Sequence, residues 1–293
     1  MLRKMRFLPP KFYARVHYAY YTGKKLDLDN PKEFNAKIQW CKVFYHPKIL
    51  TQLVDKYAVR AYVEEKIGAQ YLNELYGLYN TADEVDFEKL PQKFVIKATH
   101  ASSYNLIVTD KDKLNTKKAI SLFRKWLRIN QYYRMGQEWA YKNVPPRLIA
   151  EKYLKEDGWD SLIDYKFYCF SGEAKLLEVH LDRAQNHKRG FYDLQFNPLP
   201  YRYVSLKKSI STQVEKPENL DEMRKLAEIL AGNFPFVRVD FYSIKGKAIF
   251  GEMTFYPSDG RKDLIPDEYN SIMGDYIKLP KFEKGQKEIT EIT

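Results

Sequence analysis

Residues 236–257 read FVRVDFYSIKGKAIFGEMTFYP, and they predict a β-hairpin that carries two acids. Strands expected over 237–242 and 248–254 flank Lys245 and Gly246, which suit a tight turn. Asp240 and Glu252 then lie on adjacent antiparallel strands, where their side chains can face each other. Two acids on a hairpin are usually solvated, but apolar neighbours surround both of these. Burying such a pair is costly without a cation, and Mg²⁺ prefers one or two carboxylates together with nucleotide phosphates.

Hydrophobic spacing and turn residues outline the rest of the chain. Helices separate strands in the first half, whereas strands dominate the second half, which predicts an α+β fold with two lobes. We expect a basic helical segment over 1–54, a first lobe over 55–146 and a second lobe over 147–293. The expected helices cover 54–67, 116–129 and 219–231, the last with Asn219 as its N-cap. The other expected strands cover 72–79, 94–98, 106–109, 147–154, 163–170 and 174–182.

Composition excludes several classes of protein. The chain has 293 residues, of which 44% are hydrophobic and 30% are charged, as in ordinary globular proteins. No apolar run reaches 18 residues, so we expect no membrane span. Cys41 and Cys169 lack a CxxC partner, which argues against a disulfide scaffold, a zinc ribbon and a redox motif and favours a cytoplasmic setting. His180 and His187 have no third ligand nearby in the sequence, so we expect no zinc site.

The positive charge is concentrated at the N-terminus. The formal net charge is +11, and residues 1–26 contribute seven basic residues and no acid. Aromatic residues alternate with these cations, so the segment could contact anionic lipid. The alternative is a basic amphipathic helix that docks on its own domain and keeps its charges in solvent. Nucleic-acid binding is not expected, because the excess charge is confined to one end and no nucleic-acid motif occurs.

Several stretches taken together resemble one family. Arg238, Asp240 and the downstream E-x-x-x-x-P pattern are similar to the metal-binding end of the ATP-grasp superfamily. The resemblance narrows to the TupA-like ATP-grasp proteins of bacterial surface-polysaccharide gene clusters, and it runs over about residues 25–280. It rests on DKYAVRAYVEEKIG (55–68), DYKFYCFSGEAK (164–175), HKRGFYD (187–193), FPFVRVDFY (234–242) and GEMTFYP (251–257).

The resemblance implies an ATP-grasp fold, in which two α+β lobes grip ATP, and a set of site residues. Asp240, Glu252 and Thr254 would bind Mg²⁺, and Arg238 would stabilise an acylphosphate or a tetrahedral intermediate. Lys97 and Lys166 would contact phosphate, with Lys166 also a catalytic candidate, and Lys56 would belong to the start of the nucleotide-binding domain. The loop over 99–105 would cover the phosphates, with Ser102 and Ser103 as hydrogen-bond donors and with His100 either touching phosphate or capping the loop. The backbone of the hinge Glu151, Lys152, Tyr153 and Leu154 would meet adenine.

Two positions depart from the family pattern. The phosphate loop reads His100-Ala-Ser-Ser-Tyr104 and lacks the glycines that let a backbone approach phosphate closely. Thr254 replaces the asparagine that usually follows the metal-binding glutamate by two residues. Both departures leave a weakened enzyme open as an alternative.

The activity that the resemblance implies is an ATP-dependent carboxylate–amine ligase that joins an amino acid to a uronic acid of a surface polysaccharide. Its partners would be a small amino donor and an anionic sugar acceptor, which Arg183, His187, Lys188 and Arg189 would bind unless they form a solvated turn. Members of the family are often labelled glycosyltransferases, so that activity is an alternative. So are a nucleotide-binding protein without turnover and a kinase-type phosphotransferase. The D-x-D sequence over 27–29 looks more like a turn than a metal motif.

Overall fold

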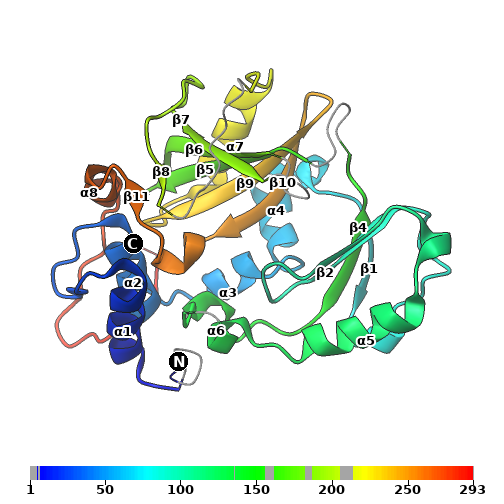
Figure 1. The fold of residues 1–293 in the computed structure, drawn as a ribbon, viewed down its shortest axis with the longest axis horizontal. Coiled ribbons are helices and arrows are strands. Elements are labelled where there is room, and N and C mark those ends of the chain that lie inside the picture. The colour runs from blue at the N-terminus through cyan, green and yellow to red at the C-terminus, as the bar shows by residue number, and fades with distance from the viewer. Residues whose placement is uncertain are drawn as a thin grey trace.

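The computed structural model describes residues 5, 7–134, 136–155, 162–181, 187–204 and 214–292. Two antiparallel sheets form separate lobes, with the smaller sheet at the right of Figure 1 and the larger one at the top. Helices from the N-terminal part of the chain lie at the lower left, beside the larger lobe. The predicted α+β architecture with two lobes and an N-terminal helical segment is therefore confirmed.

The smaller lobe is a four-stranded sheet with one long helix on one face. Its strands are β1 (Leu75–Tyr79), β2 (Phe94–Ala98), β3 (Asn105–Val108) and β4 (Leu148–Lys152), in the order β1-β4-β2-β3. Helix α5 (Thr116–Leu127) buries Ala119, Phe123 and Trp126 in the same core as alternate residues of β2 and β4. The residues that alternate with these, including Lys97 and Glu151, lie on the other face of the sheet, which is turned toward the larger lobe. The sequence predicts that the second lobe begins at residue 147, yet β4, which follows that position, pairs with β1 and β2 of the smaller sheet.

The larger lobe is a five-stranded sheet whose two faces differ in chemistry. Its order is β10-β9-β5-β6-β7. Val237, Val239 and Phe241 alternate along β9 and are fully buried in the core that also contains α7 (Leu220–Ala231). The residues between them, Arg238 and Asp240, point to the other face. The strands are β5 (Asp164–Phe170), β6 (Glu173–Leu181), β7 (Lys188–Tyr192), β9 (Val237–Ile244) and β10 (Lys247–Thr254).

The N-terminal helices belong to the core of the larger lobe. They are α1 (Pro10–Thr22), α2 (Phe34–Phe44), α3 (Ile49–Val54) and α4 (Val59–Ile67), and all contribute to the same hydrophobic cluster as the larger sheet. Helix α8 (Glu268–Tyr276) packs so closely on the start of α2 that a Cβ on Gly274 would lie 2.1 Å from the Lys32 carbonyl oxygen. Ile289 forms a parallel bridge with Tyr45, so residues near both ends of the chain meet in this lobe. The remaining elements are α6 (Gln131–Arg134), β8 (Arg202–Tyr203), β11 (Leu264–Ile265), and the 3-10 helices η2 (Ala69–Tyr71), η3 (Ala82–Glu84), η4 (Lys111–Lys113), η5 (Trp139–Tyr141) and η6 (Pro257–Gly260).

Two helix starts differ from the sequence prediction. The helix expected over 54–67 is interrupted, because Asp55 is extended and its Oδ1 accepts the backbone N–H of Tyr57 and Ala58, so α4 begins only at Val59. Asn219 takes the predicted N-cap position of α7, but its side chain forms no capping hydrogen bond, because its Oδ1 accepts the hydroxyl of Ser243 instead. In both places, a polar side chain forms a local or tertiary hydrogen bond that competes with the expected helix geometry.

The hairpin expected from residues 236–257 is present. Lys245 and Gly246 both have positive φ (51° and 75°), as a two-residue turn of the I′ type requires. Asp240 is directly opposite Glu252, and Arg238 is directly opposite Thr254. A bulge between Phe250 and Glu252 shifts this register. Without the shift, the alternation along β10 would turn Glu252 away from Asp240.

Asp259 joins the N-terminal helices to the loop that follows β10. Its carboxylate lies 2.7 Å from Lys42 Nζ on α2 and 3.0 Å from His17 Nε2 on α1, and all three side chains are buried. Burial alone would raise the pKa of Asp259, but Lys42 and His17 hold it below its usual value. Asp259 also adopts φ 61°, a conformation that Asp and Asn tolerate better than most residues.

We predict that Asp259→Asn strongly destabilises the protein. The amide keeps the shape and the tolerance of positive φ but leaves Lys42 as a buried charge without its counter-ion, at a cost of about 3–5 kcal/mol. Urea denaturation monitored by circular dichroism would measure the loss in free energy of unfolding. Asp86→Asn, at the exposed pair with Lys89, serves as the control and should change little. Equal effects of the two substitutions would contradict a stabilising role for the buried cluster.

Candidate active site

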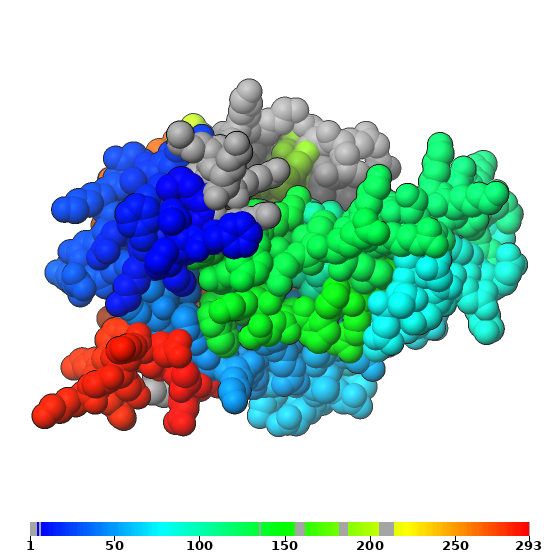
Figure 2. Space-filling model, turned by 90° about the horizontal axis from the view of Figure 1, so that it is seen from below, coloured from blue at the N-terminus to red at the C-terminus, as the bar shows by residue number. Residues whose placement is uncertain are grey.

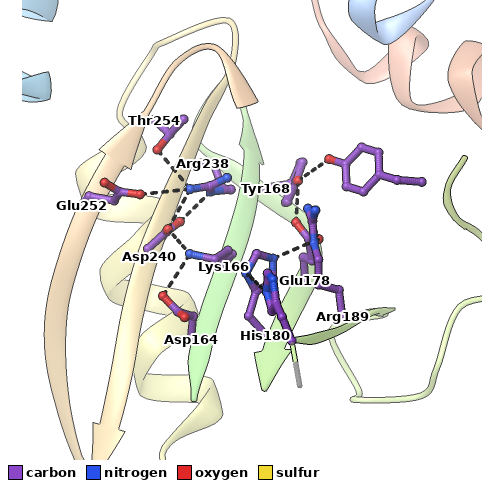
Figure 3. Close-up of polar contacts among 12 residues, drawn as sticks. Asp164, Lys166, Tyr168, Glu178, His180, Arg189, Arg238, Asp240, Glu252 and Thr254 are labelled. Atoms are coloured by element: carbon purple, nitrogen blue, oxygen red, sulfur yellow. Dashed lines mark hydrogen bonds and ion pairs between the residues drawn. The ribbon is translucent and has the colours of Figure 1, made fainter. Parts of the chain in front are cut away.

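The second face of the larger sheet presents a row of charged side chains that crosses four strands. Backbone pairing places Glu252, Asp240, Lys166 and Glu178 side by side on β10, β9, β5 and β6. Figure 3 shows their side chains on one face of the sheet, where Asp240 pairs with Lys166 and, through Arg238, is connected to Glu252. Glu178 instead pairs with His180 and Arg189. Pairing in register brings together residues that are up to 86 positions apart in the sequence.

Arg238 lies at the centre of the predicted metal ligands. Its Nη2 is 2.8 Å from Asp240 Oδ2, 3.2 Å from Glu252 Oε1 and 3.1 Å from Thr254 Oγ1. Its Nε also donates to Asp240 Oδ1 at 2.7 Å. Burial disfavours the charged guanidinium, yet Asp240 keeps the pKa of Arg238 well above its ordinary value. One nitrogen therefore contacts an oxygen from each of the three predicted metal ligands.

Lys166 neutralises the same carboxylate from the neighbouring strand. Its Nζ contacts Asp240 Oδ2 and lies 3.1 Å from Asp164 Oδ1, and the side chain is almost fully buried. Burial raises the pKa of Asp240, and the cations Arg238 and Lys166 oppose this shift. The structure thus places Lys166 within the carboxylate cluster, one strand away from the predicted metal ligands.

Two lysines lie near this cluster, Lys97 on β2 of the smaller sheet and Lys56 between α3 and α4. Lys97 Nζ lies 2.6 Å from Glu151 Oε2, and Lys56 Nζ donates to the Ala101 carbonyl oxygen at 2.8 Å. Lys56 follows Asp55, which Arg147 anchors at 2.7 Å. Burial lowers the pKa of Lys56, and Glu252 of the larger lobe is the strongest opposing influence. Lys56 is thus close enough to Glu252 to connect the two lobes electrostatically.

The loop over residues 99–105 adopts a strained turn without glycine. Ser103 has φ 68°, in the left-handed region where glycine is usually favoured. Tyr141 lies near this loop, and its pKa is raised mainly by burial, with smaller contributions from Glu138 and Glu252. His100 is buried, and its Nε2 lies 3.1 Å from the Trp126 carbonyl oxygen, so its ring packs against α5.

The predicted hinge over 151–154 is hydrogen-bonded to the residues just before β1. The Lys152 carbonyl oxygen accepts a hydrogen bond from Asn73 Nδ2 at 2.9 Å, and the Lys152 backbone N–H donates to the Glu74 carbonyl oxygen at 3.0 Å. The Lys152 side chain is exposed, whereas Tyr153 and Leu154 are half-buried. The side chain of Glu151 is turned into the site, where it pairs with Lys97 and lies 3.5 Å from Arg60 Nη1.

A second cluster surrounds Glu178 further along the sheet. Arg189 Nε donates to Glu178 Oε1 at 2.5 Å, and the Tyr168 hydroxyl donates to Glu178 Oε2 at 2.9 Å. Arg189 also lies over the ring of Tyr203, with its Cζ 4.6 Å from the ring centroid. Of the predicted substrate-binding residues, Arg189 is thus buried in this cluster, His187 is exposed and Lys188 is half-buried. Arg183 lies outside the described residues.

Neither Tyr141 nor Glu178 is among the site residues predicted from the sequence. Tyr141 belongs to the 3-10 helix η5, in an irregular stretch with no recognisable pattern, and only the fold brings it to Ser102 and Glu252. Asp27 Oδ1 accepts the backbone N–H groups of Asp29 and Asn30, so the D-x-D sequence forms a turn, as expected.

No metal site is built from protein side chains alone in the part of the chain that the structure describes. No three acids, histidines or cysteines converge there in a suitable arrangement. The candidate set of Asp240, Glu252 and Thr254 holds two carboxylates and a hydroxyl, all hard oxygen donors that suit Mg²⁺. A cation bound here would need further oxygens, which nucleotide phosphates can supply.

Comparisons with known proteins identify related sequences and structures. A family model described as TupA-like ATPgrasp matches residues 36–278, which is most of the chain. No curated protein sequence matches the chain. Among solved structures, it is similar to a D-alanine–D-alanine ligase of Bacillus anthracis, with 16% identity over 77% of this chain and 65% of that chain and a TM-score of 0.45. It is also similar to the D-alanine–D-alanine ligase of Helicobacter pylori, with 13% identity over 87% of this chain and 69% of that chain and a TM-score of 0.45. The chain thus spans just under two thirds of the length of the Bacillus anthracis ligase.

We predict that His180 makes the stability of the protein depend on pH. Burial lowers the pKa of His180 to about 3, while neighbouring Glu178 opposes the shift and Lys166 and Arg189 add to it. The unfolded chain takes up a proton near pH 6.5, whereas the folded protein does so only near pH 3. Stability is therefore lost as the pH falls between these values, by up to about 1.4 kcal/mol per pH unit.

His180→Gln should remove this contribution. Free energies of unfolding, measured in urea at several pH values, should fall less steeply with acidification for the variant than for the wild type. His187→Gln, at the exposed neighbour, is the matched control. Identical slopes for wild type and His180→Gln between pH 6.5 and 4 would disprove the prediction.

Proposed function

The chain belongs to the TupA-like ATP-grasp family, and from this membership we propose that it is an ATP-dependent carboxylate–amine ligase. The observation that carries the proposal is the convergence of oxygens from Asp240, Glu252 and Thr254 on Arg238 Nη2, each within 3.2 Å. Lys97 of the smaller sheet and Lys56, which donates to the Ala101 carbonyl oxygen, add positive charge nearby. Converging oxygens with lysines beside them suit a metal-bound nucleoside triphosphate.

Each candidate residue has a distinct role in the proposed phosphate site. Lys56 and Lys97 would bind the phosphate oxygens of ATP, and the loop with Ser102 and Ser103 would cover them. His100 would support this loop from within the smaller lobe, because its ring contacts the Trp126 carbonyl oxygen. Adenine would bind to the hinge backbone over 151–154. Asp240, Glu252 and Thr254 would hold Mg²⁺, whose chemistry when bound is to neutralise the charge that develops on the phosphates.

The proposed reaction has two steps that balance in atoms and charge. A substrate carboxylate oxygen attacks the γ-phosphorus of ATP, and the bond from that phosphorus to the bridging oxygen breaks to release ADP. An amine then attacks the carbonyl carbon of the acylphosphate, phosphate leaves and the amine loses a proton. Arg238 would stabilise negative charge on the acylphosphate and on the tetrahedral intermediate. Lys166 would hold the Asp240 carboxylate in position during both steps.

We propose an anionic sugar acceptor, a uronic acid of a bacterial surface polysaccharide, with an amino acid as the amine donor. The family resemblance suggests this class of substrate, and the charge beside the site supports it. Lys262 is half-buried, and burial and the nearby cations Arg189 and Arg261 lower its pKa. With His187, Lys188 and the predicted Arg183, these residues would add positive charge where an anionic acceptor would lie. We propose cytoplasmic action, where ATP is available.

The first prediction of this proposal concerns nucleotide binding. Isothermal titration with a non-hydrolysable ATP analogue and Mg²⁺ should give saturable binding to the wild type. Lys97→Met and Glu252→Gln should each weaken it by about tenfold or more, because each removes a charge-assisted contact. Lys152→Met is the matched control, because only the backbone of Lys152 is assigned a role. This variant should bind the ATP analogue with the same affinity as the wild type.

The opposite outcome would identify the main alternative. A wild-type protein that ignores the ATP analogue but binds a UDP-sugar would overturn the ligase proposal in favour of a glycosyltransferase. Binding of the analogue without acceptor-dependent release of ADP, across a panel of amino acids and uronates, would indicate a nucleotide-binding protein without ligase activity.

The second prediction concerns Thr254. Thr254→Val keeps the shape of the side chain and removes only the hydroxyl, so Mn²⁺ should bind about fivefold more weakly in the presence of the ATP analogue. Thr254→Asn restores a longer oxygen donor and should bind Mn²⁺ at least as tightly as the wild type. Electron paramagnetic resonance of Mn²⁺ would measure both affinities without any turnover. Unchanged affinity in Thr254→Val would remove Thr254 from the ligand set.

A further inference from the structure

Helix α1 is fixed to the larger lobe through one of its faces. Tyr13, Ala14, His17 and Tyr18 are buried. His17 Nε2 lies 3.0 Å from Asp259, and the Tyr18 hydroxyl donates to Glu33 Oε2 at 2.9 Å. The opposite face is therefore a fixed part of the protein surface. Figure 2 shows this N-terminal region, in dark blue, at the surface of the molecule.

The outer face of α1 exposes large aromatic side chains. Phe12 is 52% exposed and Tyr20 is 67% exposed, and Phe7, just before the helix, is 74% exposed. Single exposed apolar residues are common on protein surfaces and need no explanation. Here three aromatic rings occur within fourteen residues, and the exposed Arg15 stands between two of them in the sequence.

A basic hollow lies beside this face. Its volume is about 240 Å³, and it is lined by Arg15, Ala19, Gly23, Lys24, Lys25 and Leu26. Lys24 is neutralised by Glu33 at 2.8 Å and Asp267 at 2.9 Å, so it adds little net charge. Arg15 and Lys25 are exposed, and neither takes part in an ion pair with another of the described residues. The hollow thus presents two cations to an anionic group.

We infer that the outer face of α1, together with Phe7 and Lys25, is a docking surface for an anionic lipid bilayer. Aromatic rings partition into the interface of a bilayer, and Lys and Arg are attracted to anionic headgroups. Residues 1–26 hold seven basic residues and no acid, within a chain of net charge +11. Nucleic acid would be expected to use a longer basic track, whereas here cations and exposed aromatics share one short segment. The inference does not rest on the proposed catalysis.

The strength of this docking can be bounded. Each Lys or Arg near an anionic membrane surface strengthens binding by roughly fivefold, and salt screens the attraction within about a Debye length. Few aromatic side chains are available to enter the interface. The contact is therefore peripheral and reversible, and both the charges and the rings should contribute to it.

The test is co-sedimentation of the full chain with vesicles of phosphatidylcholine alone or mixed with phosphatidylglycerol. The wild type should bind the mixed vesicles and not the neutral ones. Arg15→Glu combined with Lys25→Glu should weaken binding by about 25-fold or more, since two attractive charges are lost. Lys117→Glu with Lys118→Glu, on the exposed face of α5, has the same change in net charge and should bind as the wild type.

A second pair of variants tests the rings. Phe12→Ser with Tyr20→Ser should weaken binding by about tenfold or more, whereas Ile229→Ser, at a 50% exposed position on α7, should not. Thermal melts would check that each variant folds. Equal losses in the α1 and α5 charge variants would show that net charge alone matters and would overturn the inference. So would absence of wild-type binding, or tighter binding to DNA or RNA that depends on the same residues.

Discussion

Asp240 carries a buried carboxylate that two cations from two different strands neutralise. Arg238 reaches it along its own strand, and Lys166 reaches it from the paired strand β5. This arrangement holds only if β5, β9 and β10 keep their register, since a slip by one residue would send these side chains into the apolar core. The opposite face of the sheet fixes that register, because Val237, Val239 and Phe241 must remain buried.

The local features of this protein follow from its sequence to a large extent. Alternation of apolar and polar residues, together with Lys245 and Gly246, predicts the hairpin and the juxtaposition of Asp240 and Glu252, because both depend only on neighbouring residues. The strand over 94–98 appears with the predicted bounds, and the other predicted strands shift by a few residues at their ends. No strand range is predicted from the sequence for β7, β8 or β11. Family resemblance supplies the fold, since the closure of two separate sheets around a site cannot be read from local patterns.

Through-space contacts are what the sequence leaves open. The sequence near Arg238 does not indicate that one of its nitrogens also contacts Glu252 and Thr254, because that contact depends on the bulged register between β9 and β10. The break between α3 and α4 arises from the side chain of Asp55, which binds the backbone of the next turn and is held in turn by Arg147. Tyr141 enters the site through the fold alone, and the glycine-free loop over 99–105 takes a positive φ at Ser103 that its composition argues against.

The placement of the N-terminal helices within the core of the larger lobe has a mechanical consequence. Segments from both ends of the chain build that lobe, and so does the stretch between α5 and β4, because Ala140, Tyr141 and Val144 are buried in the same core. The chain therefore passes from the smaller core to the larger one twice, once between α5 and Ala140 and once after β4. Polar contacts also tie the smaller lobe to the segment around α3 and α4: Arg147 pairs with Asp55, Arg60 lies beside Glu151, and Lys56 Nζ donates to the Ala101 carbonyl oxygen. The two sheets are thus braced against each other at several points along the chain, and a change in the angle between them would have to break these contacts together.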